Sequence, residues 1–505
     1  MRREAMTISE RLGAVPLADG GTHVAVWAPT PRRVAVRAHG REHPLRQSED
    51  GVWSGDVPLA PGDEYLLVAD GEAWPDPCSR FQPEGVRGPS RVVDTGAFRW
   101  SDAGWGGLSL DELVIYELHV GTFSEEGTFD AVVPRLRGLR ELGVGAIELM
   151  PVATFPGNRG WGYDGLYTYA PHRVYGGPDG LARLVDAAHA EGLGVILDVV
   201  YNHVGPGSEA LRAFGPYFTH RHETFWGDAI DYAQRGVREW ALQNAELWTG
   251  DYHVDGLRLD AVHAIFDDSE PHICAELEQR AGDALVISEI EVDDWRPIEE
   301  WGHDAQWVDR SHHELHVLLT GERDGYYAEY EGSLESLVED LRGRGHDPRR
   351  LVVCAQNHDQ VGNRALGDRL PPDALRLAAA VTLFSPCTPL LFMGEEYLER
   401  RPFQFFTDHI DPAIAEATRA GRRREFQEFA AFAGEEVPDP QALSTFLRSK
   451  LDPKEPDPLY RELLRLRREL PRELDAEIAG NVLRLRRGDV LLVADFANRA
   501  VELVR

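Results

Sequence analysis

Cysteine is scarce in this chain of 505 residues, and the four cysteines are too far apart to form a motif. They include no CxxC pair, which argues against a disulfide-stapled fold and against a structural zinc site. We therefore expect reduced, buried thiols at Cys78, Cys274, Cys354 and Cys387.

The histidines considered as metal ligands do not have the usual spacings of a metal site. None of them forms an HExxH or HxH motif, although histidine itself is common. A catalytic zinc usually takes mostly nitrogen ligands, so a metal-dependent hydrolase is disfavoured and no metal or other cofactor is predicted. The histidines considered for this role are His203, His263, His312, His313 and His358.

No apolar run is typical of a membrane helix. The most hydrophobic stretch, 374–393, contains Arg376, Pro386 and Pro389, which favours a buried helix followed by a turn and a strand. The first residues, MRREAMTISERLG, lack the apolar core of an export signal. We expect a cytoplasmic protein without a membrane partner.

Positive charge is in short supply. The net charge is −32, and only Lys450 and Lys454 are lysines among 53 basic side chains. Such a balance disfavours nucleic acid and other polyanions as partners, whereas a neutral substrate is compatible with it. Whether the chain forms a homo-oligomer stays open.

The rhythm of the apolar residues divides the chain into three parts. Residues 1–98 hold short alternating runs such as HVAVWAP and EYLLVAD between turns, which predicts an immunoglobulin-like β-sandwich. Residues 104–465 repeat an apolar strand, a loop and an amphipathic helix, with a charged helical insertion near 411–450. Residues 466–505 contain NVLRLRR and DVLLVADF, typical of a small C-terminal β-domain.

The repeated unit in the middle part predicts an α/β fold, a (β/α)8 TIM barrel. Two irregular stretches, 153–178 and 214–232, each follow a strand and are expected on the catalytic face. The eight strand candidates are 113–120, 146–152, 194–200, 256–260, 285–289, 304–308, 351–356 and 389–394.

Three carboxylates stand where strand candidates end. Asp260 closes VDGLRLD, Glu289 closes ALVISE, and Asp359 follows LVVCAQNH. The carboxyl ends of barrel strands meet at one mouth, which carries the active site in barrel enzymes. Three acids there suggest cleavage of a glycosidic bond, because one carboxylate attacks while another moves a proton.

Neighbouring residues predict different states for two of these acids. Arg258 lies two residues before Asp260 on the same face of a strand and favours the ionised form that a nucleophile needs. A purely structural ion pair is the alternative. Glu289 follows an apolar run, which favours the protonated form of a general acid. Glu291 is the competing carboxylate.

Two further polar stretches are candidates for substrate binding. Asp198, Asn202 and His203 lie together in DVVYNHVGP, either as a hydrogen-bonded network that holds loops or with His203 as a donor to a sugar hydroxyl. His358 and Asp359 are neighbours in the sequence and could together bind adjacent hydroxyls of a sugar. The alternative is a capped loop, because the same residue types are also common in turns and caps.

Aromatic residues are frequent in the two irregular stretches. They could fill the core, or they could stack against pyranose rings. Glycines at 160, 162 and 165 indicate a loop, so we predict Tyr163 and Trp226 among the substrate-binding residues. The full group is Trp161, Tyr163, Tyr167, Tyr169, Phe225 and Trp226.

These motifs, in this order, resemble the conserved regions of the α-amylase family of glycoside hydrolases and transferases. Longer strings, among them QNHDQVGNRALGDRL and PFQFFTDH, are similar to the members that release trehalose from malto-oligosyltrehalose by cutting the adjacent α-1,4 bond. The resemblance implies a retaining double displacement that needs no metal. It implies Asp260 as nucleophile, Glu289 as general acid/base and Asp359 as transition-state stabiliser. It also implies a sugar subsite lined by Arg258, His203, His358 and Tyr163.

Two alternatives share the motifs. An α-glucan branching enzyme would pass the glycosyl group to a sugar hydroxyl instead of water, and the longer strings favour hydrolysis. A non-catalytic glucan-binding protein ranks lower, because all three acids are present.

Overall fold

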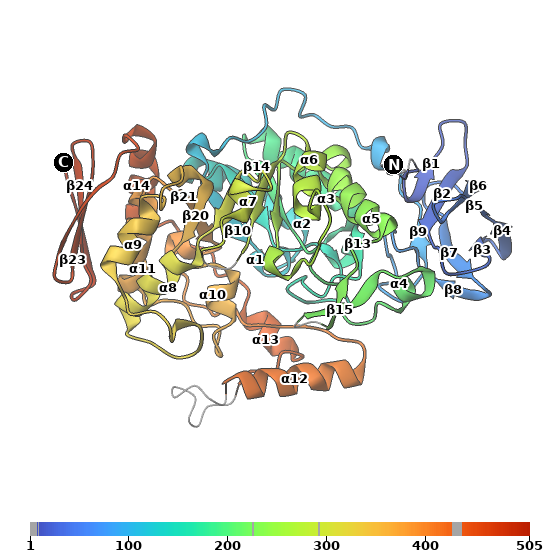
Figure 1. Cartoon of the computed structure of the whole chain (residues 1–505). Helices are drawn as coiled ribbons and strands as arrows, with labels where there is room; N and C mark the ends of the chain where they lie inside the picture. Colours follow the sequence, from blue (N-terminus) through green and yellow to red (C-terminus); the bar gives the residue numbers. More distant parts are fainter. Residues whose placement is uncertain (1–7, 9, 225–226, 291–292, 427–436) are drawn as a thin grey trace.

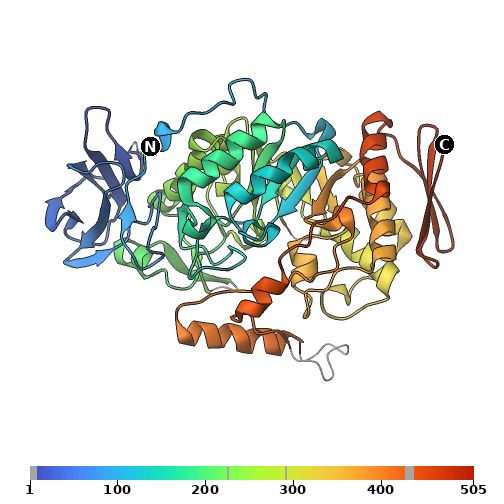
Figure 2. The same ribbon diagram turned by 180° about the vertical axis from the view of Figure 1, so that it is seen from behind.

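The computed structural model describes residues 8, 10–224, 227–290, 293–426 and 437–505. The middle part of the chain lies between an N-terminal β module and a C-terminal sheet, which are at opposite ends of the molecule (Figure 1). The helices α12 (Pro412–Phe426) and α13 (Leu443–Arg448) lie below the barrel, both in Figure 1 and in the view from behind (Figure 2).

The central part is a closed barrel of eight parallel strands in sequence order, so the predicted TIM barrel is confirmed. Each strand candidate overlaps one barrel strand, although the observed strands are shorter. The strands are β10 (Ile115–Leu118), β11 (Ala146–Leu149), β14 (Gly194–Val199), β17 (Gly256–Leu259), β18 (Leu285–Ser288), β19 (Ala305–Trp307), β20 (Leu351–Cys354) and β21 (Thr388–Phe392).

The barrel helices begin and end on signals in the sequence. Helix α2 (Phe129–Leu142) starts after Thr128, whose hydroxyl accepts a hydrogen bond from the Ala131 amide, and stops at Gly143, where φ is 118°. The other helices around the barrel are α3 (Gly177–Ala190), α5 (Arg235–Glu246), α6 (Ile273–Ala281), α8 (Asp309–Thr320), α9 (Leu334–Leu341), α11 (Pro372–Phe384) and α14 (Pro458–Glu469).

The two stretches expected to be irregular contain short ribbons. Strands β12 (Ala153–Thr154) and β13 (Tyr167–Pro171) pair in the first stretch, and β15 (Phe218–Thr224) and β16 (Gly227–Ile230) pair in the second. The prediction missed them because glycines and aromatic residues obscure the alternation of a strand.

The N-terminal module consists of two antiparallel sheets. One sheet has the order β1-β2-β6-β5, and the other has the order β4-β3-β7-β8 with β9 beside β7. Trp27 packs against Tyr217 with ring centroids 5.3 Å apart, which joins the module to the barrel domain. The strands are β1 (Gly13–Pro16), β2 (Thr22–Trp27), β3 (Val34–Ala38), β4 (Arg41–Pro44), β5 (Arg46–Gln47), β6 (Val52–Val57), β7 (Glu64–Ala69), β8 (Glu72–Trp74) and β9 (Ser90–Arg91).

The C-terminal sheet has four antiparallel strands, β22 (Asp475–Ala479), β23 (Val482–Arg487), β24 (Val490–Asp495) and β25 (Ala500–Val504). Its buried face is Leu483, Leu485, Leu492 and Ala494, and it packs against α11. The stretch 374–393 is helix α11 followed by β21, as predicted. In the described part of the chain, no helix is long and apolar enough to cross a membrane. All four cysteines are buried free thiols.

Candidate active site

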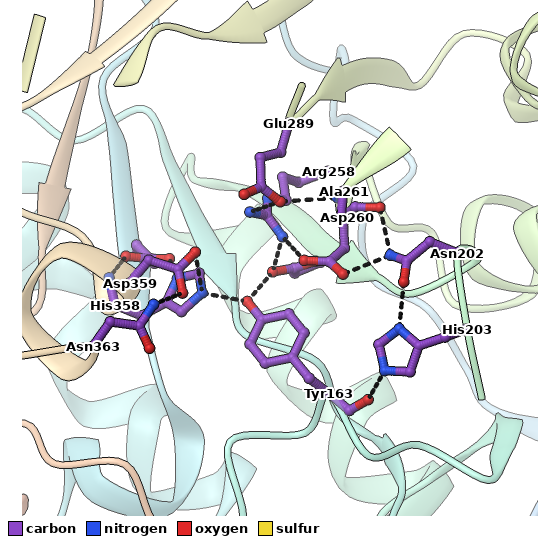
Figure 3. A network of polar contacts seen from close by, with 12 residues as sticks. Tyr163, Asn202, His203, Arg258, Asp260, Ala261, Glu289, His358, Asp359 and Asn363 are labelled. Atoms are coloured by element: carbon purple, nitrogen blue, oxygen red, sulfur yellow. Dashed lines mark hydrogen bonds and ion pairs between the residues drawn. The ribbon is translucent and has the colours of Figure 1, made fainter. Parts of the chain in front are cut away.

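One buried arginine connects the carboxylates at the C-terminal mouth of the barrel (Figure 3). Arg258, in β17, donates from Nη1 to Asp260 Oδ1 at 2.8 Å and to Asp198 Oδ2 at 2.9 Å, and its Nη2 lies 2.8 Å from Glu289 Oε2. The guanidinium carbon stands 4.3 Å from the centroid of the Trp307 ring. A rigid fork of donors thus sets the positions of three acids contributed by three strands.

Both carboxylate oxygens of Asp260 are bound. Arg258 holds Oδ1, while Asn202 Nδ2 donates to Oδ2 at 2.7 Å and to the Asp260 carbonyl at 2.8 Å. Donors on both oxygens fix the orientation of the carboxylate. The expected contact between Arg258 and Asp260 is therefore present, and Asn202 acts beside it as a support for the carboxylate.

The surroundings of Glu289 differ from the expectation of an apolar site. Its Oε2 accepts the backbone N–H of Ala261 at 2.9 Å in addition to the contact with Arg258. Ala261 has φ 41°, a left-handed conformation that a residue other than glycine rarely adopts. Such strained residues concentrate at functional sites, and here the bend directs an N–H at a carboxylate. The apolar run of β18 packs behind Glu289 and leaves its carboxyl in a polar cluster.

His358 and Asp359 occupy the first turn of α10 (His358–Gly362), directly after β20. Glu117 Oε2 accepts the His358 backbone N–H at 2.9 Å, and Glu117 Oε1 bonds Nδ1 of the ring. Burial lowers the pKa of His358, but the charges of Asp359 and Glu117 outweigh burial and raise it to about 10. The ring is therefore protonated at neutral pH, and its Nε2 lies 3.3 Å from Asp359 Oδ2. The capping role falls to Asn357, whose side chain accepts from Gln360 N.

Tyr163 lies between the two polar clusters. Its hydroxyl donates to Asp198 Oδ2 at 2.6 Å and accepts from His358 Nε2 at 2.7 Å, with the two rings stacked 5.2 Å apart. Burial raises the pKa of Asp198 to about 7, against the opposing charge of Arg258. Tyr163 thus joins the acids around Arg258 to the His358–Asp359 pair.

His203 is engaged by the protein on both ring nitrogens. Nε2 contacts the Tyr163 carbonyl at 3.0 Å, and Nδ1 contacts Asn202 Oδ1. Burial lowers the pKa of His203 to about 4, so the ring is neutral. The interpretation as a loop-holding network describes these contacts, and the predicted bond to a sugar hydroxyl remains a prediction.

Most of the aromatic residues predicted in these two stretches are buried in the core. Trp161, Tyr167 and Tyr169 are each less than 5% exposed, so the core-filling interpretation applies to them. Gly162, by contrast, confirms the tight loop, since φ is 106° and a Cβ would lie 2.1 Å from the Pro151 carbonyl oxygen. Phe225, Trp226 and Glu291 lie outside the described residues.

Three acids of the site escaped the sequence interpretation. Glu117 in β10 and Glu148 in β11 are buried partners in neighbouring strands. Asp309 begins α8, after β19; burial and the nearby charges of Glu289 and Asp359 raise its pKa to about 7. The signal for the first two was an acidic residue inside an otherwise apolar strand, IYEL and AIEL, which is costly without a polar partner.

Comparison with known proteins supports this arrangement. Residues 98–226 match the family model "Alpha amylase, catalytic domain", and residues 11–81 match "Carbohydrate-binding module 48 (Isoamylase N-terminal domain)". The malto-oligosyltrehalose trehalohydrolase of Deinococcus radiodurans is 47% identical over 91% of this chain and 83% of its own length. The chain belongs to the malto-oligosyltrehalose trehalohydrolase family, within the α-amylase family.

A second trehalohydrolase and a solved structure are also similar to this chain over most of its length. The trehalohydrolase of Rhizobium sp. strain M-11 is 42% identical over 96% of this chain and 93% of its length. A solved structure from Salmonella typhimurium, assigned as an α-amylase, superposes with a TM-score of 0.88 at 38% identity, covering 96% of this chain and 92% of that one. By contrast, a 1,4-alpha-glucan branching enzyme of Burkholderia vietnamiensis is 35% identical over 50% of this chain and 40% of its own length.

Proposed function

We propose that this protein hydrolyses the α-1,4-glucosidic bond next to the terminal trehalose of malto-oligosyltrehalose. The products are trehalose and a shortened malto-oligosaccharide. The observation that carries the proposal is 40–47% identity to three trehalohydrolases over more than nine-tenths of the chain. The cluster of acids around Arg258 supports a glycosidase mechanism.

In this mechanism Asp260 is the nucleophile and Glu289 the general acid/base. An oxygen of Asp260 attacks the anomeric carbon while Glu289 gives its proton to the oxygen that leaves with trehalose, so one carbon–oxygen bond forms as another breaks. Glu289 then takes a proton from water, which attacks the same carbon and frees Asp260. Arg258 and Asn202 hold the carboxylate of Asp260 in a fixed orientation through their hydrogen bonds.

The remaining residues would bind and distort the sugar ring. We assign Asp359 to the charge that develops on the ring in the transition state, with His358 positioned beside it by Glu117. Tyr163, Asp198 and Arg258 complete the wall of this subsite through the hydrogen bonds described above. Preorganised groups of this kind act without reorganising during the reaction.

The test is incubation with purified malto-oligosyltrehalose. Free trehalose should accumulate at the rate at which substrate disappears, and amylose treated in parallel should gain no α-1,6 linkages. Branch points in amylose without trehalose release would establish the branching enzyme instead. The absence of both at high enzyme concentration would favour the binding protein.

A further inference from the structure

A cleft of about 430 Å³ lies at the N-terminal end of the barrel strands, opposite the active site. Two of its lining residues, Arg349 and Pro386, stand shortly before β20 and β21. The end of α9 contributes Arg342, and the segment between α14 and β22 contributes Arg472 and Glu473. The volume falls in the range of roughly 300–1,000 Å³ that is usual for small-molecule sites.

Two of the three arginines that line the cleft are paired with carboxylates. Arg349 binds the carboxylates of Asp347 and Asp111. Arg472 shares the second of them, since its Nη2 lies 3.2 Å from Asp111 Oδ1. The third, Arg342, donates from Nε to a backbone carbonyl at 3.3 Å and has no carboxylate partner in the part of the chain that the structure describes. Its positive charge is therefore left without a counter-charge.

Two further arginines lie behind the cleft, and both bind backbone carbonyls. Arg487, which is 2% exposed, donates to the Phe384 carbonyl at 2.9 Å and to the Ser385 carbonyl at 3.2 Å. Arg467 donates to the Leu383 carbonyl at 3.3 Å and also to the Ser385 carbonyl. These carbonyls belong to the C-terminal end of α11, and a helix end of this kind is equivalent to about half a negative charge. Two full positive charges exceed it.

These arginines are close enough to repel one another. Arg467 Nη2 also lies 3.5 Å from the carbonyl oxygen of Pro386, which lines the cleft. Burial lowers the pKa of Arg467 to about 9, and the positive charges of Arg487 and Arg472 contribute to the same effect. Burial lowers the pKa of Arg487 to about 10, again with a contribution from Arg472, while Glu473 acts in the opposite direction. An anion in the cleft would relieve this repulsion.

We propose that the cleft binds the phosphate group of a small molecule, either inorganic phosphate or a phosphate monoester. The phosphate lies between Arg342 and Arg472 and offsets the positive charge behind Pro386. Arginine suits this ligand because its planar fork of N–H donors matches two phosphate oxygens at once. The net charge of the chain is −32, so the surface as a whole repels anions, and the affinity comes from this local surplus of arginine.

A phosphate in this cleft connects two parts of the molecule. Arg342 and Arg349 belong to the barrel domain, whereas Arg472 belongs to the segment that leads into the C-terminal sheet. A ligand held by both parts stabilises the folded protein, because it binds only when they are assembled. The site is remote from the catalytic acids and does not depend on the proposed function.

Thermal unfolding of the full-length protein tests the site. Sodium phosphate at about 10 mM should raise Tm by about 1–3 °C over sodium chloride of equal ionic strength. The rise should disappear in Arg342→Gln/Arg472→Gln. Arg32→Gln is the control for a lost positive charge, because Arg32 is exposed in the N-terminal module, and it should keep the full rise. An equal rise in the double variant, or none in the wild type, would overturn the site.

Calorimetry adds a variant that should bind more tightly. Arg342→Gln should weaken the binding of inorganic phosphate by about five- to tenfold, whereas Glu473→Gln, which removes a carboxylate from the lining, should strengthen it by about two- to fivefold. Unchanged affinity in both folded variants would also overturn the site. Glucose 6-phosphate, with glucose as its uncharged control, separates the two sources of the phosphate group: tighter binding than inorganic phosphate supports an ester, and weaker binding supports the free ion.

Discussion

Replacing Glu117 with glutamine tests whether this buried acid controls the charge of His358. The Glu117 side chain is fully buried and accepts two hydrogen bonds from one residue, the backbone N–H and the ring Nδ1 of His358. Glutamine has the same shape but no charge, and its amide nitrogen must face one of these two donors. The variant therefore removes one negative charge and one hydrogen bond.

The magnitude follows from the charge that is lost. Two unit charges about 4 Å apart interact by about 4 kcal/mol at an effective dielectric constant near 20. Since one pKa unit corresponds to about 1.4 kcal/mol, the pKa of His358 should fall by up to about 3 units. It would then move from about 10 toward about 7, with Asp359 still holding part of the shift.

The raised pKa of His358 determines how the stability of the fold depends on pH. The protonated ring stabilises the wild-type fold fully below its ordinary pKa of about 6.5, and this contribution is lost as pH rises through about 10. In Glu117→Gln the contribution is smaller and its loss is complete at lower pH, because the folded-state pKa is lower. NMR titration of ¹³C-labelled histidine measures the pKa directly, and kcat/KM should decline at lower pH than in the wild type.

Glu148→Gln is the matched control. Glu148 faces Glu117 across the β10–β11 pair, and among the described residues neither of its carboxyl oxygens has a hydrogen-bond partner. Burial, followed by the charge of Glu117, raises the pKa of Glu148 well above its ordinary value and so favours the neutral form, which glutamine resembles in shape and charge. A His358 pKa that stays near 10 in Glu117→Gln, or falls equally in both variants, would refute the reasoning.

Three further substitutions have defined outcomes. Asp260→Asn should lower kcat by at least roughly a thousandfold with an unchanged circular dichroism spectrum, and activity near wild type would remove Asp260 from the nucleophile's role. Tyr163→Phe keeps the ring but loses two hydrogen bonds of the hydroxyl, so kcat/KM should fall about tenfold, and an unchanged value would contradict its place in the subsite. Gly236→Ala places a Cβ 2.0 Å from the Trp27 ring of the N-terminal module and should cost about 1–3 kcal/mol in urea unfolding, whereas full stability would show that the contact relaxes freely.

Much of the fold was predictable because its signals are local. An apolar run of five to eight residues, in most cases followed by an amphipathic helix, recurs eight times, and each run overlaps a barrel strand. The ribbons β12–β13 and β15–β16 were missed, since glycine-rich and aromatic segments carry no regular alternation. The burial of Trp161 and Tyr169 was equally unpredictable, because it depends on what packs against the ring.

The sequence by itself determined which side chains end the barrel strands, and hence that Asp260, Glu289 and Asp359 share one mouth: in a parallel barrel the ends of all strands meet. It did not determine their partners. Glu117 meets His358 across 241 positions of the chain, and Arg258 reaches Asp198 across 60. Such pairs, and the protonation they impose, exist only when distant strands come into register and water is excluded between them.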